Sequence, residues 1–196
     1  MVKMTSRDSP LPPFDYLRAS QGILHDCAVH DIDVLAWVFG EKPVSVYTTA
    51  HSFIKEIGDM NDVDSVAIVV KFPSGGIGLV DLSRFSIFGY DQRMEVFGEK
   101  GMLVQHNYKP TNVEFSGETG SSMDRIYHSF PERYAESYCA VMEHFLDIIE
   151  GKCTADITKE STLLSCEIIQ ACEDSLASGQ AVTLKQWKDV LQENTF

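Results

Sequence analysis

The spacing of apolar positions changes twice along the chain. Residues 22–39 repeat apolar side chains at helical spacing, and Gly40 followed by Pro43 predicts the end of that helix. From residue 44 to about 115 the apolar period is two, in segments rich in Val, Ile, Tyr and Phe that Gly and Pro interrupt. This part of the chain therefore predicts one helix followed by five or six strands.

The helical period returns in the last third. Residues 134–149 place apolar side chains on one face, and Gly151 stands at the C-terminal cap position. A second helix is expected from Thr158, a typical N-cap residue, to Gly179. Residues 116–129, which precede these helices, are polar and rich in Ser and Gly, so we predict a mobile loop there.

Short connections decide how the strands pair. The sequences PSGG at 73–76 and GEKG at 98–101 are typical of hairpin turns. A parallel crossover needs about a dozen residues or more, so most neighbouring strands must be antiparallel. We therefore predict an α+β fold, with an open, predominantly antiparallel mixed sheet and its helices on one face, as a two-layer sandwich.

One face of this sheet has no predicted cover. In the segment 65–72, apolar residues occupy both faces of the strand, with Ile68 on one side and Val69 on the other. A sheet that is apolar on both faces but has helices on one predicts a partner on the other. We expect a homo-oligomer that pairs through this open face, most simply a two-fold dimer.

The composition limits which partners and which cellular location are expected. The 196 residues include 16 Lys and Arg against 29 Asp and Glu, a net charge of -13. Such a surface repels phosphate backbones and anionic lipids, so we expect no nucleic-acid partner and no membrane partner. No apolar run approaches the ~20 residues that span a bilayer. The first residues do not resemble a secretory signal, so the expected location is cytoplasmic.

The cysteines show no C-x-x-C pair, and their number is odd. This pattern predicts reduced, buried thiols rather than a disulfide framework. The five residues are Cys27, Cys139, Cys153, Cys166 and Cys172.

The segment 25–33 holds the densest set of reactive side chains. Asp26 and His30 are four residues apart and share one face of the predicted helix. A carboxylate beside an imidazole orients the ring and raises its pKa, as general acid–base catalysis requires. A solvated charged face explains the same residues, and the spacing alone leaves both interpretations open. A metal site is disfavoured, because His25 and Cys27 point away from Asp26.

Phosphate loops and nucleophile motifs are missing from the sequence. The glycines at 75–78 lead into a strand rather than a helix, and no G-x-G-x-x-G or G-x-S-x-G occurs. Tyr90 begins a strand, where a tyrosine either packs or lines a polar site. Four other large aromatic side chains are predicted to pack in the core: Tyr134, Tyr138, Trp37 and Trp187.

Several motifs together resemble one known family. The sequence Ser6-Arg7-Asp8 and a proline-rich crossover precede Asp26-x-x-x-His30-Asp31. Two further segments follow, GYDQRMEVFGEKG at 89–101 and FPERYAESYCAVMEHFLDIIEG at 130–151. This combination covers nearly the whole chain. It resembles the C-terminal domain of the glucose–fructose oxidoreductase/inositol dehydrogenase (Gfo/Idh/MocA) family, in its inositol 2-dehydrogenase-like branch.

The resemblance implies an NAD(P)-dependent oxidoreductase that acts on the hydroxyl of a small sugar or polyol. It implies that Asp26 and His30 are the catalytic pair. His30 would accept the hydroxyl proton, and Asp26 would orient and tune the imidazole. It also implies that Tyr90 contacts the substrate, as do Arg7 and Cys27 on the substrate side. No metal is implied.

The family's dinucleotide-binding Rossmann domain is not recognisable in the sequence. We expect residues 1–14 to be the end of that missing domain and a crossover, and residues 15–196 to form a substrate-binding and oligomerisation domain. The tripeptide Glu41-Lys42-Pro43 resembles the family's catalytic lysine motif but follows the first helix, so Lys42 is given no catalytic role. NAD or NADP is the implied cofactor, and we expect no binding to this chain alone.

Two functions stay open from the sequence. The chain is expected to be the substrate-binding and oligomerisation half of a polyol dehydrogenase, inactive alone. The alternative is a non-catalytic, self-associating interaction module derived from the same domain.

Overall fold

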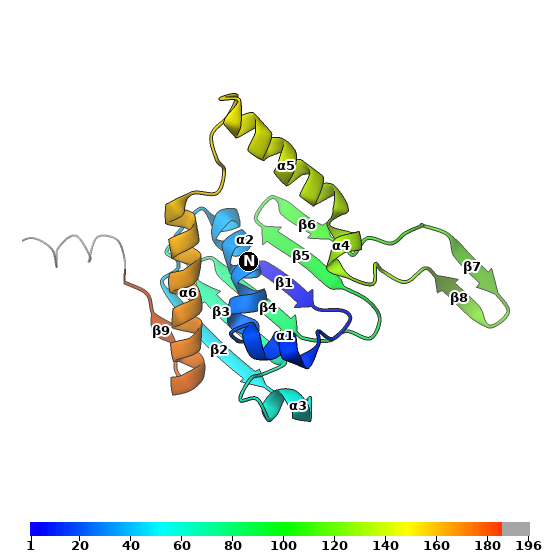
Figure 1. Cartoon of the computed structure of the whole chain (residues 1–196), viewed down its shortest axis with the longest axis horizontal. Helices are drawn as coiled ribbons and strands as arrows, with labels where there is room; N and C mark the ends of the chain where they lie inside the picture. Colours follow the sequence, from blue (N-terminus) through cyan, green and yellow to red (C-terminus); the bar gives the residue numbers. More distant parts are fainter. Residues whose placement is uncertain (186–196) are drawn as a thin grey trace, which may run out of the picture.

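A seven-stranded mixed sheet is the main layer of the structure, a computed structural model that describes residues 1–185 (Figure 1). Its strands follow the order β6-β5-β1-β4-β3-β2-β9, and within these residues only β1 and β4 are parallel neighbours. The strands are β1 (Val2–Arg7), β2 (Ser45–His51), β3 (Ser65–Lys71), β4 (Ile77–Ser83), β5 (Asp91–Gly98), β6 (Gly101–Gln105) and β9 (Val182–Thr183). The predicted α+β fold with a mostly antiparallel sheet is confirmed.

Helices cover one face of this sheet, with α2 and α6 crossing it (Figure 1). The helices are α1 (Phe14–Ala19), a π-helical turn (Leu24–Ala28), α2 (Val29–Phe39), α3 (Lys55–Gly58), α4 (Phe130–Arg133), α5 (Ala135–Ile149) and α6 (Lys159–Ser178). The predicted caps are confirmed: Gly40 and Gly179 are left-handed, and the Thr158 hydroxyl accepts the Ser161 N–H at 3.1 Å. None of the described helices is long and apolar enough to cross a membrane.

Strand alternation divides the sheet into a buried face and an open face. In β3, Val66 and Ile68 are buried under the helices, whereas Ala67 between them is exposed. The buried face packs tightly, because a Cβ on Gly78 of β4 would come within 2.5 Å of the Leu35 side chain. Helix α2 can therefore approach β4 only where the strand carries no side chain.

The N-terminal segment belongs to the same sheet. β1 lies between β4 and β5, with Met4 opposite Val80 on one side and Met94 on the other. The sequence predicts residues 1–14 to be the end of a separate domain and a crossover, whereas the structure makes their strand a central one in this sheet. A six-residue strand carries no local signal of which sheet it joins, so only its long-range pairing reveals this.

Part of the predicted loop over residues 116–129 is instead a hairpin. β7 (Glu114–Gly117) pairs with β8 (Gly120–Met123), and the pair extends away from the sheet (Figure 1). Gly120 has a φ of 116°, which a glycine adopts without strain. The Ser- and Gly-rich composition identified the turn but concealed the two short strands beside it.

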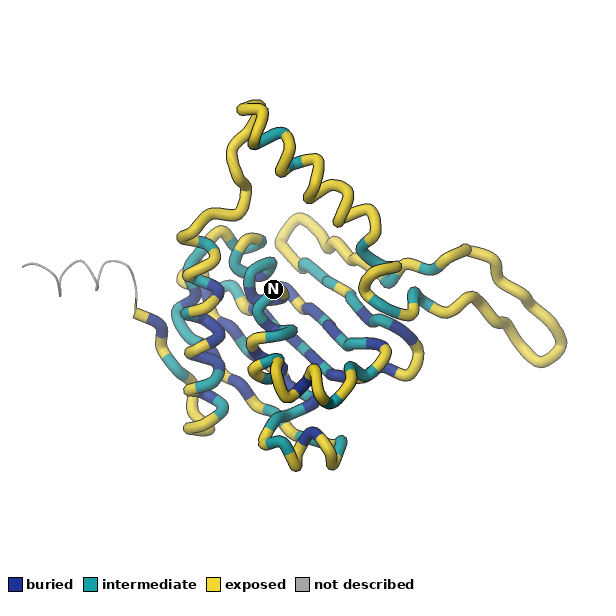
Figure 2. The backbone as a smooth tube through the Cα atoms, in the orientation of Figure 1, coloured by how far each residue is buried: buried dark blue, intermediate teal, exposed yellow. Residues whose placement is uncertain are grey.

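The apolar face of α5 is not buried against the described residues. Val141, Phe145 and Ile149 are 63%, 53% and 65% exposed, and Figure 2 shows α5 exposed along nearly its whole length. The prediction that this face, with Tyr138, belongs to the core is therefore wrong. Helical periodicity reveals that a helix has an apolar face, but not which body covers it.

Two other packing predictions are revised. The five cysteines are free thiols, but three of them, Cys139, Cys153 and Cys166, are exposed rather than buried. Trp37 lies on the outer side of α2 and is 79% exposed, so it is not a core residue. Trp187 lies outside the described residues.

Candidate active site

A cavity of about 640 Å³ opens where the start of the α2 segment, β1, β5 and the α4–α5 segment meet. It brings together four of the five predicted site residues. Its polar and titratable lining includes Asp8, Tyr16, Asp26, Cys27, His30, Asp31, Tyr90, Gln92, Arg93 and Tyr134.

Two donors hold the Asp26 carboxylate at the edge of this cavity. Tyr16 of α1 donates its hydroxyl to Oδ1 at 2.6 Å, and Arg84 Nη1 donates to Oδ2. The hydrogen bond to Asp26 raises the pKa of Tyr16 to about 12, so the phenol remains a donor at neutral pH. Asp26 therefore has a fixed orientation before any substrate binds.

Arg84 follows β4 directly, and its fully buried side chain joins several elements. Its Nη1 lies 3.3 Å from Cys27 Sγ, and its Nη2 donates to Ser20 Oγ at 3.2 Å. Asp62 Oδ2 is 3.9 Å from Nη2. A buried guanidinium needs such anionic and polar partners, because removing an unpaired charge from water is costly. Arg84 thereby ties the Asp26 segment to the sheet.

The helix that carries Asp26 and His30 is not regular. Leu24–Ala28 form a π-helical turn, and regular α-helix begins at Val29. A π-turn has a wider repeat than an α-helix, so residues four apart no longer stack directly. Asp26 and His30 line the same cavity, yet among the described contacts there is no direct hydrogen bond between them, and His30 is exposed.

Cys27 and Tyr90 add two uncharged groups. Burial raises the pKa of the Cys27 thiol to about 12, so it is not a thiolate near neutral pH. Burial also raises the pKa of Tyr90, whose ring meets that of Tyr134 edge-on, with centroids 5.9 Å apart. The backbone N–H of Tyr90 donates to the Tyr127 carbonyl at 2.9 Å. Tyr90 thus packs against an aromatic neighbour and also lines the cavity.

Sequence reasoning assigned no role to two further carboxylates of the cavity. Asp31 is only 5% exposed, and burial raises its pKa to about 7. Asp8 stands at the end of β1, where burial raises its pKa although it accepts the Ser9 N–H at 2.9 Å. Tyr16 and Arg84 also escaped notice. Their contacts with Asp26 span 10 and 58 residues of sequence, and no local pattern encodes such distances.

The structure does not bring Arg7 into this cavity. Because side chains alternate along β1, Ser6 faces the helices and Arg7 faces the open side of the sheet. There Arg7 pairs with Asp81 and lies 3.6 Å from Asp91. Lys42 also lies outside the cavity lining and pairs with Glu167 of α6 at 2.7 Å.

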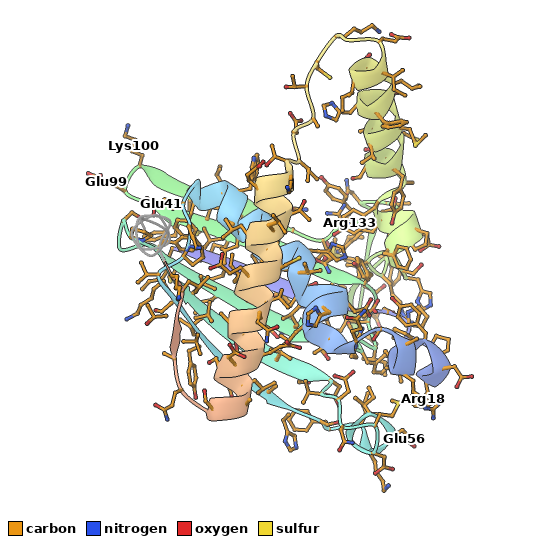
Figure 3. The ribbon with its side chains drawn as sticks, turned by 60° about the vertical axis from the view of Figure 1, so that its left-hand side comes forward. Arg18, Glu41, Glu56, Glu99, Lys100 and Arg133 are labelled. Carbon is orange, nitrogen blue, oxygen red and sulfur yellow. The ribbon has the colours of Figure 1, made fainter. Side chains whose placement is uncertain are left out.

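The wall opposite Asp26 comes from α4 and α5. Phe130, Tyr134, Tyr138 and Val141 line the cavity from this side. At its base the Arg133 guanidinium lies 4.1 Å from the Tyr108 ring centroid, and Figure 3 shows α5 rising from this point clear of α6. This wall therefore contacts the rest of the structure mainly at its foot.

The described residues offer no obvious metal or dinucleotide site. Within residues 1–185, no group of three or more His, Cys, Asp or Glu side chains is arranged to hold a metal ion. The parallel strands β1 and β4 are separated in sequence by two further strands, not by a single crossover helix. The described part of the chain thus lacks the strand–loop–helix arrangement that cradles a dinucleotide pyrophosphate.

Comparison with known proteins identifies the family. Residues 11–184 match the sequence model described as "Oxidoreductase family, C-terminal alpha/beta domain" of Gfo/Idh/MocA. The chain belongs to the Gfo/Idh/MocA oxidoreductase family. Within this family, the myo-inositol 2-dehydrogenase of Thermotoga maritima is 34% identical over 187 residues, which cover 95% of this chain and 56% of that protein.

Two further relatives support the same family assignment. The scyllo-inositol 2-dehydrogenase (NAD(+)) of Bacillus subtilis is 31% identical over 185 residues, covering 91% of this chain and 52% of that protein. The crystal structure of a myo-inositol dehydrogenase from Corynebacterium glutamicum is 33% identical, with a TM-score of 0.88, and covers 94% of this chain and 56% of that one. This Gfo/Idh/MocA chain therefore spans little more than half the length of the relatives it matches, and it corresponds to their C-terminal domain.

Proposed function

We propose that this Gfo/Idh/MocA domain binds a cyclic polyol and handles its hydroxyl proton in an NAD(P)-dependent dehydrogenase. The observation that carries the proposal is that Asp26 and His30 line one cavity, with Asp26 held by Tyr16 and Arg84. The names of the relatives, inositol dehydrogenases, support a ring polyol as the substrate.

His30 is the proposed proton acceptor. Its side chain is exposed at the cavity, and no hydrogen bond from the described residues occupies its ring nitrogens, so one nitrogen is available to a substrate hydroxyl. Asp26 would accept a hydrogen bond from the polyol and fix its orientation relative to the imidazole. A bound nicotinamide supplies the hydride acceptor.

Cys27 and Tyr90 are the proposed substrate contacts. The thiol and the phenol are uncharged near neutral pH, so they can pack against the ring and donate to hydroxyl oxygens without attracting an ion. Arg7 is left out of this proposal. Its guanidinium is engaged with Asp81 on the opposite side of the sheet.

We propose that a separate dinucleotide-binding domain holds the cofactor and that this chain alone does not bind NAD(H). The exposed apolar face of α5 supports this, because Val141 lines the cavity and Phe145, one turn further on, is more than half exposed. A domain seated there would lie beside the cavity mouth.

Calorimetric titration of the chain with NADH tests the cofactor proposal, for which we expect no detectable heat of binding. Micromolar affinity would contradict it. In a second experiment, the dinucleotide-binding half of an inositol dehydrogenase is fused ahead of Met1, and polyol-dependent reduction of NAD+ is followed by absorbance.

His30→Ala should lower kcat of this fusion by about 10²–10⁴-fold, the usual contribution of a general base. His25→Ala is the matched control, since His25 pairs with Glu173 at 2.9 Å outside the cavity lining, and it should leave kcat unchanged. Equal loss in both variants, or no turnover by a fusion that folds and binds NADH, would sink the catalytic proposal.

A second proposed role is self-association through the open face of the sheet. A hollow of about 830 Å³ lies there, lined in part by Phe85 and Phe88, and Ile87 beside them is 82% exposed. The half-buried Val69 shares this face. Exposed apolar groups of this kind favour a homo-oligomer, and they equally favour a non-catalytic interaction module if the fusion proves inactive.

Val69→Lys should shift the assembly toward monomer or toward aggregate, as measured by sedimentation. Ile157→Lys makes the same change of charge at an exposed position away from the sheet and should have no effect. A parent chain that sediments as a monodisperse monomer of 21.9 kDa at micromolar concentration would count against self-association.

A further inference from the structure

Some carboxylates around the cavity have an arginine partner, and others do not. Asp26 is paired with Arg84, whose side chain is fully buried. Arg93, on the β5 side, binds Asp91 through two hydrogen bonds of 2.7 and 3.0 Å. Arg84 and Arg93 are thus committed to carboxylates, whereas Arg133, at the base of the wall, contacts the rings of Tyr108 and Tyr134. No lysine is among the lining residues.

Asp8 and Asp31 differ from Asp26 and Asp91 in their charge partners. Both line the cavity, and neither has a Lys, Arg or His partner within ion-pair distance among residues 1–185. Among the described residues, the Asp8 carboxylate accepts only the backbone N–H of Ser9, at 2.9 Å, and the Arg84 charge acts on it from further away. Asp31 lies beside the Ser6 hydroxyl, which Gln92 also contacts at 2.5 Å. Two partly or fully buried carboxylates therefore face the cavity without a cation of their own.

The other titratable groups of the cavity do not offset this charge. Burial or hydrogen bonding raises the pKa of Tyr16, Cys27 and Tyr90, so these three are neutral near pH 7. Two basic side chains line the cavity: Arg93, which is paired with Asp91, and His30, which stands at the exposed edge. Burial raises the pKa of Asp8 and that of Asp31, the latter to about 7, so a cation that binds beside these two groups would favour their charged form.

We propose that this cavity selects its ligand by charge: it binds a cyclic polyol that carries a protonated amine more tightly than the neutral polyol, and it excludes the phosphorylated polyol. The inference rests on the proposed function only in placing a polyol here. An ammonium group would donate to Asp8 or Asp31 and supply the missing counter-charge. A phosphate would meet the same carboxylates, while Arg84 and Arg93 are already committed to Asp26 and Asp91.

Calorimetry on the 196-residue chain tests the order of affinities at pH 7 and low salt, with myo-inositol, an amino-deoxy-inositol and myo-inositol monophosphate as probes. We expect the amine to bind about fivefold tighter than myo-inositol, the effect of one partly exposed ion pair. The phosphate should bind at least about tenfold more weakly than myo-inositol. An amine that binds no tighter, or a phosphate that binds as well, overturns the inference and leaves the proposed function intact. If none of the three binds, both are overturned.

Charge-neutral variants locate the effect. Asp8→Asn and Asp31→Asn should each reduce the advantage of the amine to about twofold or less, because each removes one uncompensated carboxylate. Asp59→Asn changes the net charge by the same amount in the exposed α3 segment and should leave the advantage unchanged. An equal reduction by Asp59→Asn would mean that the net charge of -13 is responsible, and would overturn the assignment to the cavity. Thermal melts confirm that each variant is folded.

Discussion

The two walls of the cavity are built in opposite ways. On one wall, Asp26 is fixed by Tyr16 and by the buried Arg84, within a segment packed on the sheet. On the other wall, α5 lines the cavity at its base and then carries exposed apolar residues such as Phe145 away from the sheet (Figure 2). The first wall is held in place by contacts within the domain. The second wall carries apolar side chains like those of a buried surface, but these side chains are exposed.

This difference separates what the domain does alone from what it does with a partner. Groups that orient a substrate must be held within a few tenths of an ångström, and the Asp26 wall achieves this with internal contacts. An exposed apolar helix face gains stability only when another body covers it. Substitutions on the first wall should therefore change the stability of the isolated chain, and substitutions on the second should not.

The largest effect is expected from Arg84→Met. Removing the guanidinium leaves Asp26 and Asp62 without their buried counter-charge, which should lower the free energy of unfolding by about 3–5 kcal/mol in urea titrations. Arg18→Met is the control, because the exposed Arg18 pairs only with Asp15 on the surface and should cost at most about 0.5 kcal/mol. A loss below about 1 kcal/mol for Arg84→Met would contradict the proposed structural role of this arginine.

Asp31→Asn should alter how stability depends on pH. The pKa of Asp31 is raised from 3.8 to about 7 by burial, so the folded state binds this proton more tightly than the unfolded state. Its contribution is fully present below about pH 4 and is lost as the pH rises through about 7. Relative to the parent, Asp31→Asn should therefore gain about 2–4 kcal/mol of stability between these limits, measured by urea unfolding at several pH values. A constant difference across this range would refute the raised pKa.

Tyr16→Phe should have a smaller effect. It deletes the 2.6 Å hydrogen bond to Asp26 at a partly exposed site, for which about 1 kcal/mol of stability is expected. Ultraviolet titration of the parent should show one tyrosine with a pKa near 12, and this transition should disappear in Tyr16→Phe. Tyr47→Phe, on the open face of the sheet, serves as the control and should leave this transition in place.

The smallest effect on stability is expected on α5. Phe145→Ala should change the free energy of unfolding by no more than about 0.5 kcal/mol, while reducing the binding of a hydrophobic dye. The matched buried change, Leu35→Ala on α2, should cost about 2–5 kcal/mol. If Phe145→Ala destabilises the chain as much as Leu35→Ala does, then α5 is not the uncovered wall that the structure describes.

The sequence predicted most of the elements because their signals are local. The helical and strand periods, the caps at Gly40, Thr158 and Gly179, and the turn at 98–101 all depend on residues within a few positions of one another. The motif that carries Asp26 and His30 is local in the same sense, which is why both residues could be named before the fold was known.

Long-range contacts account for what the sequence missed. The membership of β1 in this sheet, the buried Arg84 behind Asp26 and the burial of Asp31 each depend on residues brought together from different parts of the chain. The π-turn at Leu24–Ala28 also departs from the regular helix that the apolar spacing predicts. Side chains alternate along β1, so Arg7 lies on the opposite side of the sheet from the cavity once the face that the helices cover is known.

The sequence by itself thus determined the order of elements, the acidic character of the surface and the residue types available for proton transfer. Only the tertiary structure decided which carboxylates gain a counter-charge, which helix face stays uncovered and which side chains share a cavity. The physical reason is that period, capping and composition act over a few residues, whereas burial and charge pairing depend on distances in space that no short stretch of sequence contains.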